Sequence, residues 1–322
     1  LIYNVINIMT LKEEILNYLS EHSGDYISGE ELAQNLGKSR AGVWKAVKAL
    51  QADGYTITAV TNRGYMFDAN NDILNENELK KYIDFDCNVA FYKSIDSTNN
   101  EAKRIITDGD TKPLLVVGEE QTAGRGRQGK SFYSPAKTGI YMSLVVHPMA
   151  KLQNAVTATT AASVAVCKAI EKLTDITPQI KWVNDVYVDG KKICGILTEA
   201  VTNFETQTVE SVVIGIGVNL KTHNFPSDVQ NASCLEAPVK RAEFIATVAN
   251  ELNGIVTGDY SAFIDYYRSH SMIVGKDINF IKNGITTPAT AVGIDDVGGL
   301  EVVLPDGTHD VLRSGEITVR TR

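Results

Sequence analysis

The sequence predicts an α+β chain of three consecutive parts, and three patterns lead to this prediction. Short helices separated by a glycine-containing turn open the chain, strands alternate with helices through its middle, and short strands separated by turns close it. A length of 322 residues suits roughly two or three domains. We expect an N-terminal domain at residues 9–67, a linker at 68–80, a central mixed α/β domain at 81–271 and a small closed β-barrel at 272–322.

The composition, with 43% hydrophobic and 22% charged residues, is that of an ordinary globular protein. A net charge of −8 excludes a surface that binds polyanions everywhere, so contact with nucleic acid needs a local basic face. The four cysteines form no CxxC pair, which argues against a zinc site or a disulfide framework and favours a cytoplasmic location. No apolar stretch reaches the ~18 residues of a membrane helix. Residues 1–8 lack the basic region of a signal peptide, so we expect no membrane contact.

The N-terminal part is predicted to be a helix-turn-helix followed by a hairpin. Apolar spacing indicates helices at residues 11–22, 29–36 and 40–52, with Ser28 and Ser39 as N-caps. Alternating residues at 55–60 and 64–67 indicate two strands, which would form a wing with Arg63 near its tip.

The third predicted helix buries Val43, Val47 and Leu50 and turns a basic side outward, where only Asp53 opposes it. Phosphate contacts supply much of the affinity of a recognition helix, so this side and the wing predict DNA binding. The DNA-contacting residues that we expect are Ser39, Arg40, Trp44, Lys45, Lys48 and Arg63. The alternative is a small helical interaction module whose basic face is merely solvated.

The central part is predicted to contain strands at residues 88–95, 114–121, 139–147 and 211–219. Helices are predicted at 100–107, at 152–173, and at about 240–257 and 260–270. Ser97 precedes the first of these helices and, taken alone, is best interpreted as a simple N-cap. In the strand at 211–219, Gly215, Gly217 and Asn219 share one face, which indicates close approach by a ligand or by a tightly packed helix.

Residues 124–129, here called the arginine loop, alternate glycine with Arg125 and Arg127. Glycine lets a backbone approach a ligand closely, and guanidinium groups match phosphate and carboxylate. The loop therefore suits closure over an anion, although a mobile surface loop with solvated arginines explains the pattern equally well.

A hairpin is predicted about Asp189-Gly190. A two-residue loop puts Val188 opposite Lys191 and Tyr187 opposite Lys192. Asp185 then shares a face with Lys192, and Asn184 shares one with Lys191 and Gly195. An exposed cross-strand ion pair is the simpler interpretation of the acidic residue and the lysine. Further along, short strands at 277–281, 289–293, 299–304, 308–312 and 316–320 predict the C-terminal barrel.

Taken together, these motifs resemble the bacterial family of bifunctional biotin protein ligases and biotin operon repressors. The matching positions are residues 97–99, Gln121, 124–129, 181–185, 192–197 and 215–219. They follow the family's order, and the likeness spans residues 9–322. Val183 stands where the family commonly has proline, which leaves the strand register there open. The resemblance implies an N-terminal winged helix, a catalytic domain of the biotin/lipoate-ligase type and a C-terminal SH3-like barrel.

The resemblance also implies an enzyme that uses ATP with Mg²⁺ to activate biotin as biotinyl-5′-AMP. The biotinyl group would then pass to a lysine of a biotin carboxyl carrier protein. Catalytic roles would fall to Lys192, Arg127 and Arg125. The implied biotin contacts are Ser97, Thr98, Asn99, Gln121, Arg125, Gly126, Arg127 and Lys192. The implied ATP or adenylate contacts are Gly129, Phe132, Lys181, Asn184, Asp185 and Asn219. The phosphates would hold the Mg²⁺, with Asp185 the one protein ligand considered.

For regulation, the resemblance implies a homodimer on operator DNA of biotin genes, with biotinyl-5′-AMP as corepressor. Two other classes stay open. One is a lipoate or related acyl ligase, against which the arginine loop and the winged helix both argue. The other is a transcription factor that senses a small molecule without chemistry, against which Lys192 and the anion-binding residues argue.

Overall fold

The computed structural model describes residues 9–106, 112–147, 155–202, 208–227, 229, 231–258, 260–282 and 284–319. Thr107 and residues 152–154, expected at helix ends, lie outside the described residues, as do Arg320 and residues 1–8. The chain forms two compact units, Leu1–Ile73 and Leu74–Arg322. Among the described residues, no helix is long and apolar enough to span a membrane.

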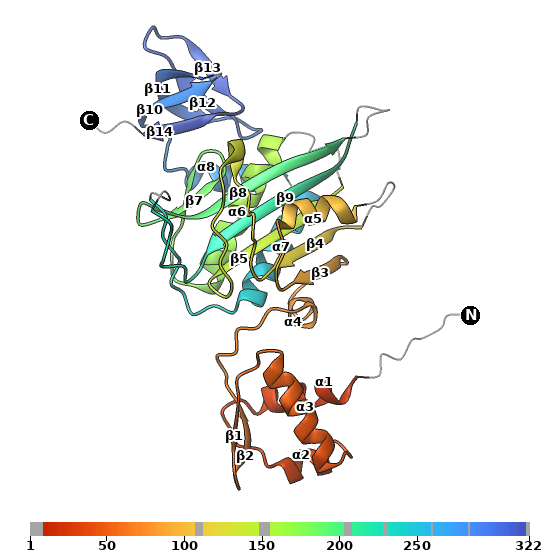
Figure 1. The fold of residues 1–322 in the computed structure, drawn as a ribbon. Coiled ribbons are helices and arrows are strands. Elements are labelled where there is room, and N and C mark those ends of the chain that lie inside the picture. Colours follow the sequence, from red (N-terminus) through yellow and green to blue (C-terminus); the bar gives the residue numbers. More distant parts are fainter. Residues whose placement is uncertain are drawn as a thin grey trace. The chain divides into compact units, whose positions relative to one another are not determined.

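The first unit is a helix-turn-helix followed by a two-stranded hairpin (Figure 1). Its elements are α1 (Leu11–Glu21), α2 (Gly29–Asn35), α3 (Arg40–Ala52), β1 (Ile57–Val60) and β2 (Gly64–Phe67). Ser28 and Ser39 cap α2 and α3 as expected. Gly64 lies so close to the segment before α2 that a Cβ atom there would sit 2.1 Å from the Ile27 carbonyl oxygen. Glycine therefore lets the wing pair with that segment.

The second unit begins inside the stretch that composition assigns to a linker, residues 68–80. Helix α4 (Glu76–Lys80) occupies its end, and Leu79 is fully buried in the core of the second unit. The polar residues that suggested a linker have a different role, because the Asn75 side chain caps α4.

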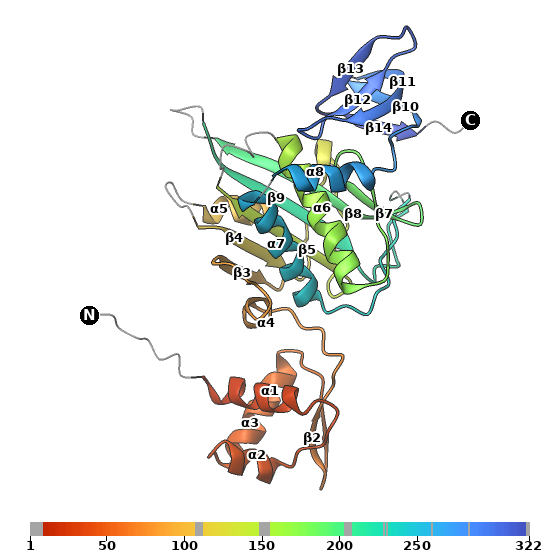
Figure 2. The same cartoon turned by 180° about the vertical axis from the view of Figure 1, so that it is seen from behind.

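A mixed sheet organises the second unit, with seven strands among the described residues. In spatial order they are β3 (Asn88–Tyr92), β4 (Leu114–Gly118), β5 (Gly139–Val146), β9 (Val209–Asn219), β8 (Lys191–Thr202), β7 (Asp185–Val188) and β6 (Gln179–Lys181). The β3–β4 pair is parallel and the others are antiparallel. Helices α6 (Ala155–Leu173) and α7 (Arg241–Thr257) pack on one face, and α5 (Thr98–Ile105) on the other (Figures 1 and 2).

The register around Val183 is regular. Gln179 lies opposite Tyr187 and Lys181 opposite Asp185, so β6 and β7 form an antiparallel pair. The peptide bond between Trp182 and Val183 is cis. The indole nitrogen of Trp182 donates to the Gly298 carbonyl at 2.9 Å, which ties this turn to the C-terminal strands.

After α8 (Tyr260–Ser269) the chain forms a five-stranded antiparallel sheet rather than a demonstrably closed barrel. The strands are β10 (Asp277–Lys282), β11 (Ile285–Ile294), β12 (Leu300–Val303), β13 (His309–Leu312) and β14 (Glu316–Val319). Their order is β13-β12-β11-β10-β14, and no pairing among the described residues joins β13 to β14. Apolar side chains such as Ile278, Val302 and Ile317 belong to the same core as the central sheet.

Candidate ligand site and DNA-binding face

A cleft of about 310 Å³ opens beside α5 and is lined by residues from distant parts of the second unit. They come from the start of α5, the arginine loop, the β7–β8 hairpin, β9 and β14. All of the residues expected to contact biotin line this cleft: Ser97, Thr98, Asn99, Gln121, Arg125, Gly126, Arg127 and Lys192. Of the expected ATP contacts, those that line it are Phe132, Lys181, Asn184 and Asp185.

The start of α5 forms a buried polar wall of the cleft. Ser97 is 2% exposed and occupies the N-cap position, but its side chain makes no capping hydrogen bond. The simple N-cap interpretation of Ser97 is therefore wrong. The Thr98 backbone N–H donates to Gln121 Oε1 at 2.9 Å, and Ser143 Oγ donates to Asn99 Oδ1 at 2.6 Å. These bonds position neutral donors and acceptors that suit a polar, uncharged part of a ligand.

The glycine face of β9 accommodates two side chains of the protein itself. A Cβ atom on Gly215 would lie 2.1 Å from Asn99 Oδ1, and one on Gly217 would lie 2.5 Å from the Phe132 ring. The sequence left a ligand and a packed helix as alternatives, and Asn99 of α5 fills the space at Gly215. The glycines thus let the polar wall and Phe132 sit directly on the sheet.

Both arginines of the arginine loop are held at the cleft. The Arg125 guanidinium donates to Asn100 Oδ1 at 2.9 Å and lies 3.1 Å from Glu199 Oε1. Arg127 donates to Asn184 Oδ1 at 2.9 Å and to the Gly315 carbonyl at 3.2 Å. The structure therefore favours a ligand-facing loop over one with solvated arginines.

Glu199 contacts two residues that line the cleft, and the sequence did not single it out. Its carboxylate accepts from Asn99 Nδ2 at 2.9 Å and from Lys103 Nζ at 3.0 Å, and it pairs with Arg125. Burial raises the pKa of Glu199, but these hydrogen bonds and the two cations outweigh burial and lower it. Glu199 is thus ionised at neutral pH and balances the charge of Arg125. Nothing in the local sequence of β8 signals this pairing.

The hairpin brings Lys192 and Asp185 together, with Lys192 Nζ 2.7 Å from Asp185 Oδ1. Val188 lies opposite Lys191 and Tyr187 opposite Lys192, as predicted. A bulge then shifts the register by one residue, so Gly195 lies opposite Asp185 and not on the face of Asn184. The side chains of Lys192 and Asp185 are 34% and 19% exposed and line the cleft. The pair is therefore not an outer-surface ion pair.

Two residues predicted on the nucleotide side do not line the cleft. Asn219 is 5% exposed at the end of β9, and its side-chain nitrogen donates to the Ser233 carbonyl at 3.2 Å. Gly129 ends a short turn with open space around its α-carbon and φ of +75°.

The outer side of α3 presents Trp44, Lys45 and Lys48, all exposed. The pattern of opposing charges differs from the prediction. Arg40 lies 3.5 Å from Glu30 of α2, and Asp53 pairs with Lys12 of α1 at 2.7 Å.

Two further residues of the predicted DNA-binding set also have contacts within the first unit. Ser39 Oγ accepts the capping bond from the Gly42 backbone N–H. The Arg63 guanidinium lies over the Tyr26 ring, 4.0 Å from its centroid, which holds it against the wing.

Comparison with known proteins assigns a class to both units. Residues 91–219 match the biotin/lipoate A/B protein ligase family, and residues 12–66 match a helix-turn-helix domain. The fold and the cleft therefore define a protein of the biotin/lipoate ligase class joined to a helix-turn-helix domain.

Whole-length relatives narrow this class. The chain is 30% identical over 316 residues to the bifunctional ligase/repressor BirA of Bacillus spizizenii. The alignment covers 94% of this chain and 97% of that protein. It is 26% identical over 311 residues to the protein of the same name from Escherichia coli, covering 93% and 94% respectively. The chain belongs to this family of bifunctional ligase/repressors.

Solved structures share the fold. A biotin protein ligase from Aquifex aeolicus, in complex with biotin and ATP, superposes with a TM-score of 0.60 at 24% sequence identity. The superposition covers 73% of this chain and 99% of that one.

Proposed function

We propose that this chain activates biotin with ATP as biotinyl-5′-AMP and transfers the biotinyl group to a lysine of a biotin carboxyl carrier protein. In the same proposal, it represses genes of biotin synthesis and uptake, with biotinyl-5′-AMP as corepressor. The observation that carries the proposal is the convergence, in one cleft, of every residue expected to contact biotin, in a chain of the ligase/repressor family. The helix-turn-helix unit supports the regulatory half.

In the first step, a carboxylate oxygen of biotin attacks the α-phosphorus of ATP, a P–O bond forms and pyrophosphate leaves. Two anions must approach each other, so fixed positive charge at the reacting atoms lowers the barrier. Lys192 and Arg127, which both line the cleft, supply it, while Glu199 balances Arg125. In the second step, the amine of the carrier lysine attacks the biotinyl carbonyl carbon and AMP leaves with the bonding electrons.

The donor set of the cleft also fits Mg²⁺, which binds proteins through one or two carboxylates together with substrate phosphates. Asp185 offers a carboxylate that lines the cleft. The metal would neutralise phosphate charge there. Asp185 meanwhile holds the Lys192 ammonium at the cleft at 2.7 Å.

A DNA-binding domain, a catalytic domain and a C-terminal domain are also part of the proposal, with the C-terminal sheet as the SH3-like element. Its support is a small antiparallel sheet of five short strands. A cytoplasmic location is supported by four cysteines that are all free thiols. A homodimer on operator DNA is supported by the helix-turn-helix domain, a kind that commonly acts in symmetric pairs.

A pyrophosphate-release assay tests the enzymatic half of this proposal. The protein is incubated with ATP, Mg²⁺ and either biotin, lipoate or neither. Of the three samples, we expect only the one with biotin to release pyrophosphate. Once carrier protein is added, we expect the biotinyl group to be transferred to it. Release with lipoate in place of biotin would identify a lipoate ligase. Biotin binding without any pyrophosphate would identify a sensor that performs no chemistry, and either result would contradict the proposal.

A further inference from the structure

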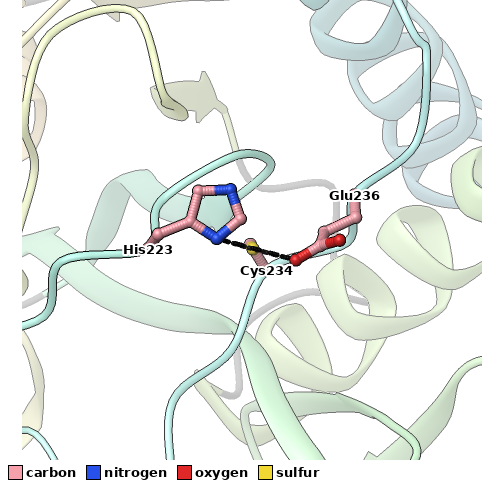
Figure 3. Close-up of side chains that lie close together, drawn as sticks. All are labelled: His223, Cys234 and Glu236. Atoms are coloured by element: carbon pink, nitrogen blue, oxygen red, sulfur yellow. Dashed lines mark hydrogen bonds and ion pairs between the residues drawn. The ribbon is translucent and has the colours of Figure 1, made fainter.

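Three side chains of metal-ligand type converge in the segment between β9 and α7. They are His223, Cys234 and Glu236, and their ligand atoms all lie within 4.8 Å of one another (Figure 3). In the part of the chain that the structure describes, this is the one group of three such residues. None of them lines the ligand cleft.

The distances between the three donor atoms match the edges of a tetrahedron around zinc. His223 Nδ1 lies 3.8 Å from Cys234 Sγ and 3.6 Å from Glu236 Oε1, and Sγ lies 3.5 Å from that oxygen. Zinc bonds of about 2.3 Å to sulfur and about 2.0–2.2 Å to nitrogen and oxygen give tetrahedral edges of about 3.4–3.6 Å. Shifts of a few tenths of an ångström would therefore bring the three side chains to the corners of such a site.

The same residue types also form nucleophilic triads, but the arrangement here is different. In a triad, the nucleophile and the orienting carboxylate bind opposite nitrogens of the imidazole. Here Cys234 and Glu236 both approach Nδ1, and Glu236 also accepts from the thiol. Because the three donor atoms converge on one point, the arrangement favours a metal site over a nucleophilic triad.

Backbone bonds hold the donors in place. The Leu235 N–H donates to the Asn219 carbonyl at 2.9 Å and the Glu236 N–H to the Leu220 carbonyl at 2.8 Å. These bonds pin the segment of Cys234 and Glu236 beside the end of β9. His223 and Glu236 are 63% and 66% exposed, so an ion reaches the site directly from solvent.

We propose that His223, Cys234 and Glu236 bind one Zn²⁺ ion, with a water molecule completing a tetrahedral shell. Thiolate, imidazole and carboxylate are all zinc ligands, and a mixed sulfur, nitrogen and oxygen set suits zinc better than Mg²⁺ or Ca²⁺. Binding converts the Cys234 thiol to a thiolate and releases its proton, so the affinity falls as pH is lowered.

The ion would close a loop whose backbone also forms hydrogen bonds with Lys192 at the start of β8. The Lys192 N–H donates to the Asn231 carbonyl at 2.9 Å, and the Ser233 N–H donates to the Lys192 carbonyl at 2.8 Å. A metal that joins His223 to Cys234 restrains the segment containing Asn231 and Ser233. We therefore expect Zn²⁺ to slow hydrogen exchange at the amides of Lys192 and Ser233.

The test uses the full-length chain, stripped with a chelator and kept reduced, without ATP or Mg²⁺. Zn²⁺ is titrated against a chromophoric chelator, and Co²⁺ is added separately to record thiolate-to-cobalt charge-transfer absorption. We expect one ion per chain and a charge-transfer band. Cys234→Ser should abolish the band, and both Cys234→Ser and His223→Gln should weaken Zn²⁺ binding by more than about tenfold.

Two matched controls come from the same unit. Cys87 is another partly buried free thiol, and His270 forms a second His–Glu pair, with Glu171 at 3.1 Å. Cys87→Ser and His270→Gln should leave the affinity and the cobalt spectrum unchanged. Absence of stoichiometric binding, or a band that survives in Cys234→Ser, would overturn the proposal. Circular dichroism confirms that each variant is folded, so a lost band reports lost ligation.

Discussion

Lys192 is the residue on which the proposed adenylation depends most directly. Its ammonium is partly buried in the cleft beside Asp185, where solvent screens its charge less than at an open surface. A cation that acts on the developing charge of the transition state changes the rate of the step more than the binding of biotin.

Lys192→Ala should therefore reduce the single-turnover rate of biotinyl-5′-AMP formation by about 100-fold or more, the size typical of losing one transition-state-stabilising group. The dissociation constant for biotin should change far less. Lys191→Ala is the matched control, because Lys191 is the exposed neighbour at the hairpin turn and does not line the cleft. Rapid-quench measurement of the adenylate gives both rates. If Lys192→Ala formed biotinyl-5′-AMP at a rate near that of the parent protein, Lys192 would have no role in adenylation beyond its ion pair with Asp185.

At the scale of elements, three of the six residues predicted to contact DNA already have contacts within the first unit. Arg40 has an acidic neighbour in Glu30, Ser39 caps its own helix and Arg63 rests on Tyr26. The Arg40–Glu30 pair is highly exposed and therefore contributes little to stability. Lys45 and Lys48 remain as exposed cations along the outer side of α3.

Lys48→Gln should flatten the salt dependence of DNA binding by about one unit of slope, the effect of losing one phosphate contact. The measurement is the DNA affinity of the full-length chain at several salt concentrations, on a duplex that the parent protein selects from a random library. Lys12→Gln serves as control, since Lys12 lies on α1 and pairs with Asp53. Equal slopes for Lys48→Gln and the parent would remove Lys48 from the contact surface.

At the scale of the whole molecule, we expect oligomerisation to link the two proposed activities, ligation and repression. A single DNA-binding module of this size buries little surface, so symmetric pairs on two half-sites are the usual route to tight binding. The arginine loop is rich in glycine, and a ligand that orders it removes an entropy cost that dimerisation would otherwise bear.

Sedimentation equilibrium of the full-length chain should thus show a dimer that tightens by about tenfold or more with biotinyl-5′-AMP, within the usual range of allosteric coupling. Biotin alone should have a smaller effect. Lys48→Gln should dimerise like the parent, which separates assembly from DNA contact. Identical dissociation constants for the ligand-free and biotinyl-5′-AMP-bound dimers would contradict the coupling even if ligation and DNA binding were both confirmed.

The sequence by itself determined the features that depend on neighbours along the chain. Helix α3 spans the predicted residues 40–52, the Asp189-Gly190 turn sets the first pairs of its hairpin, and the arginine loop follows a buried strand. Caps, periodicity and turn chemistry are local interactions, so a pattern of a few residues contains them. The resemblance of motifs then predicted most of the side chains that meet in the cleft, although Gly129 and Asn219 do not line it.

Only the tertiary structure decided the contacts between residues that are distant along the chain. Glu199 reaches Arg125 across 74 positions, and the register shift that puts Gly195 opposite Asp185 depends on a bulge. The separation of His223 from Cys234 matches no cysteine-pair motif. Backbone pairing of residues 235 and 236 with the end of β9 places Cys234 and Glu236 close to His223. Such contacts follow from sheet topology and strand register, which depend on packing across the whole unit and leave no local pattern.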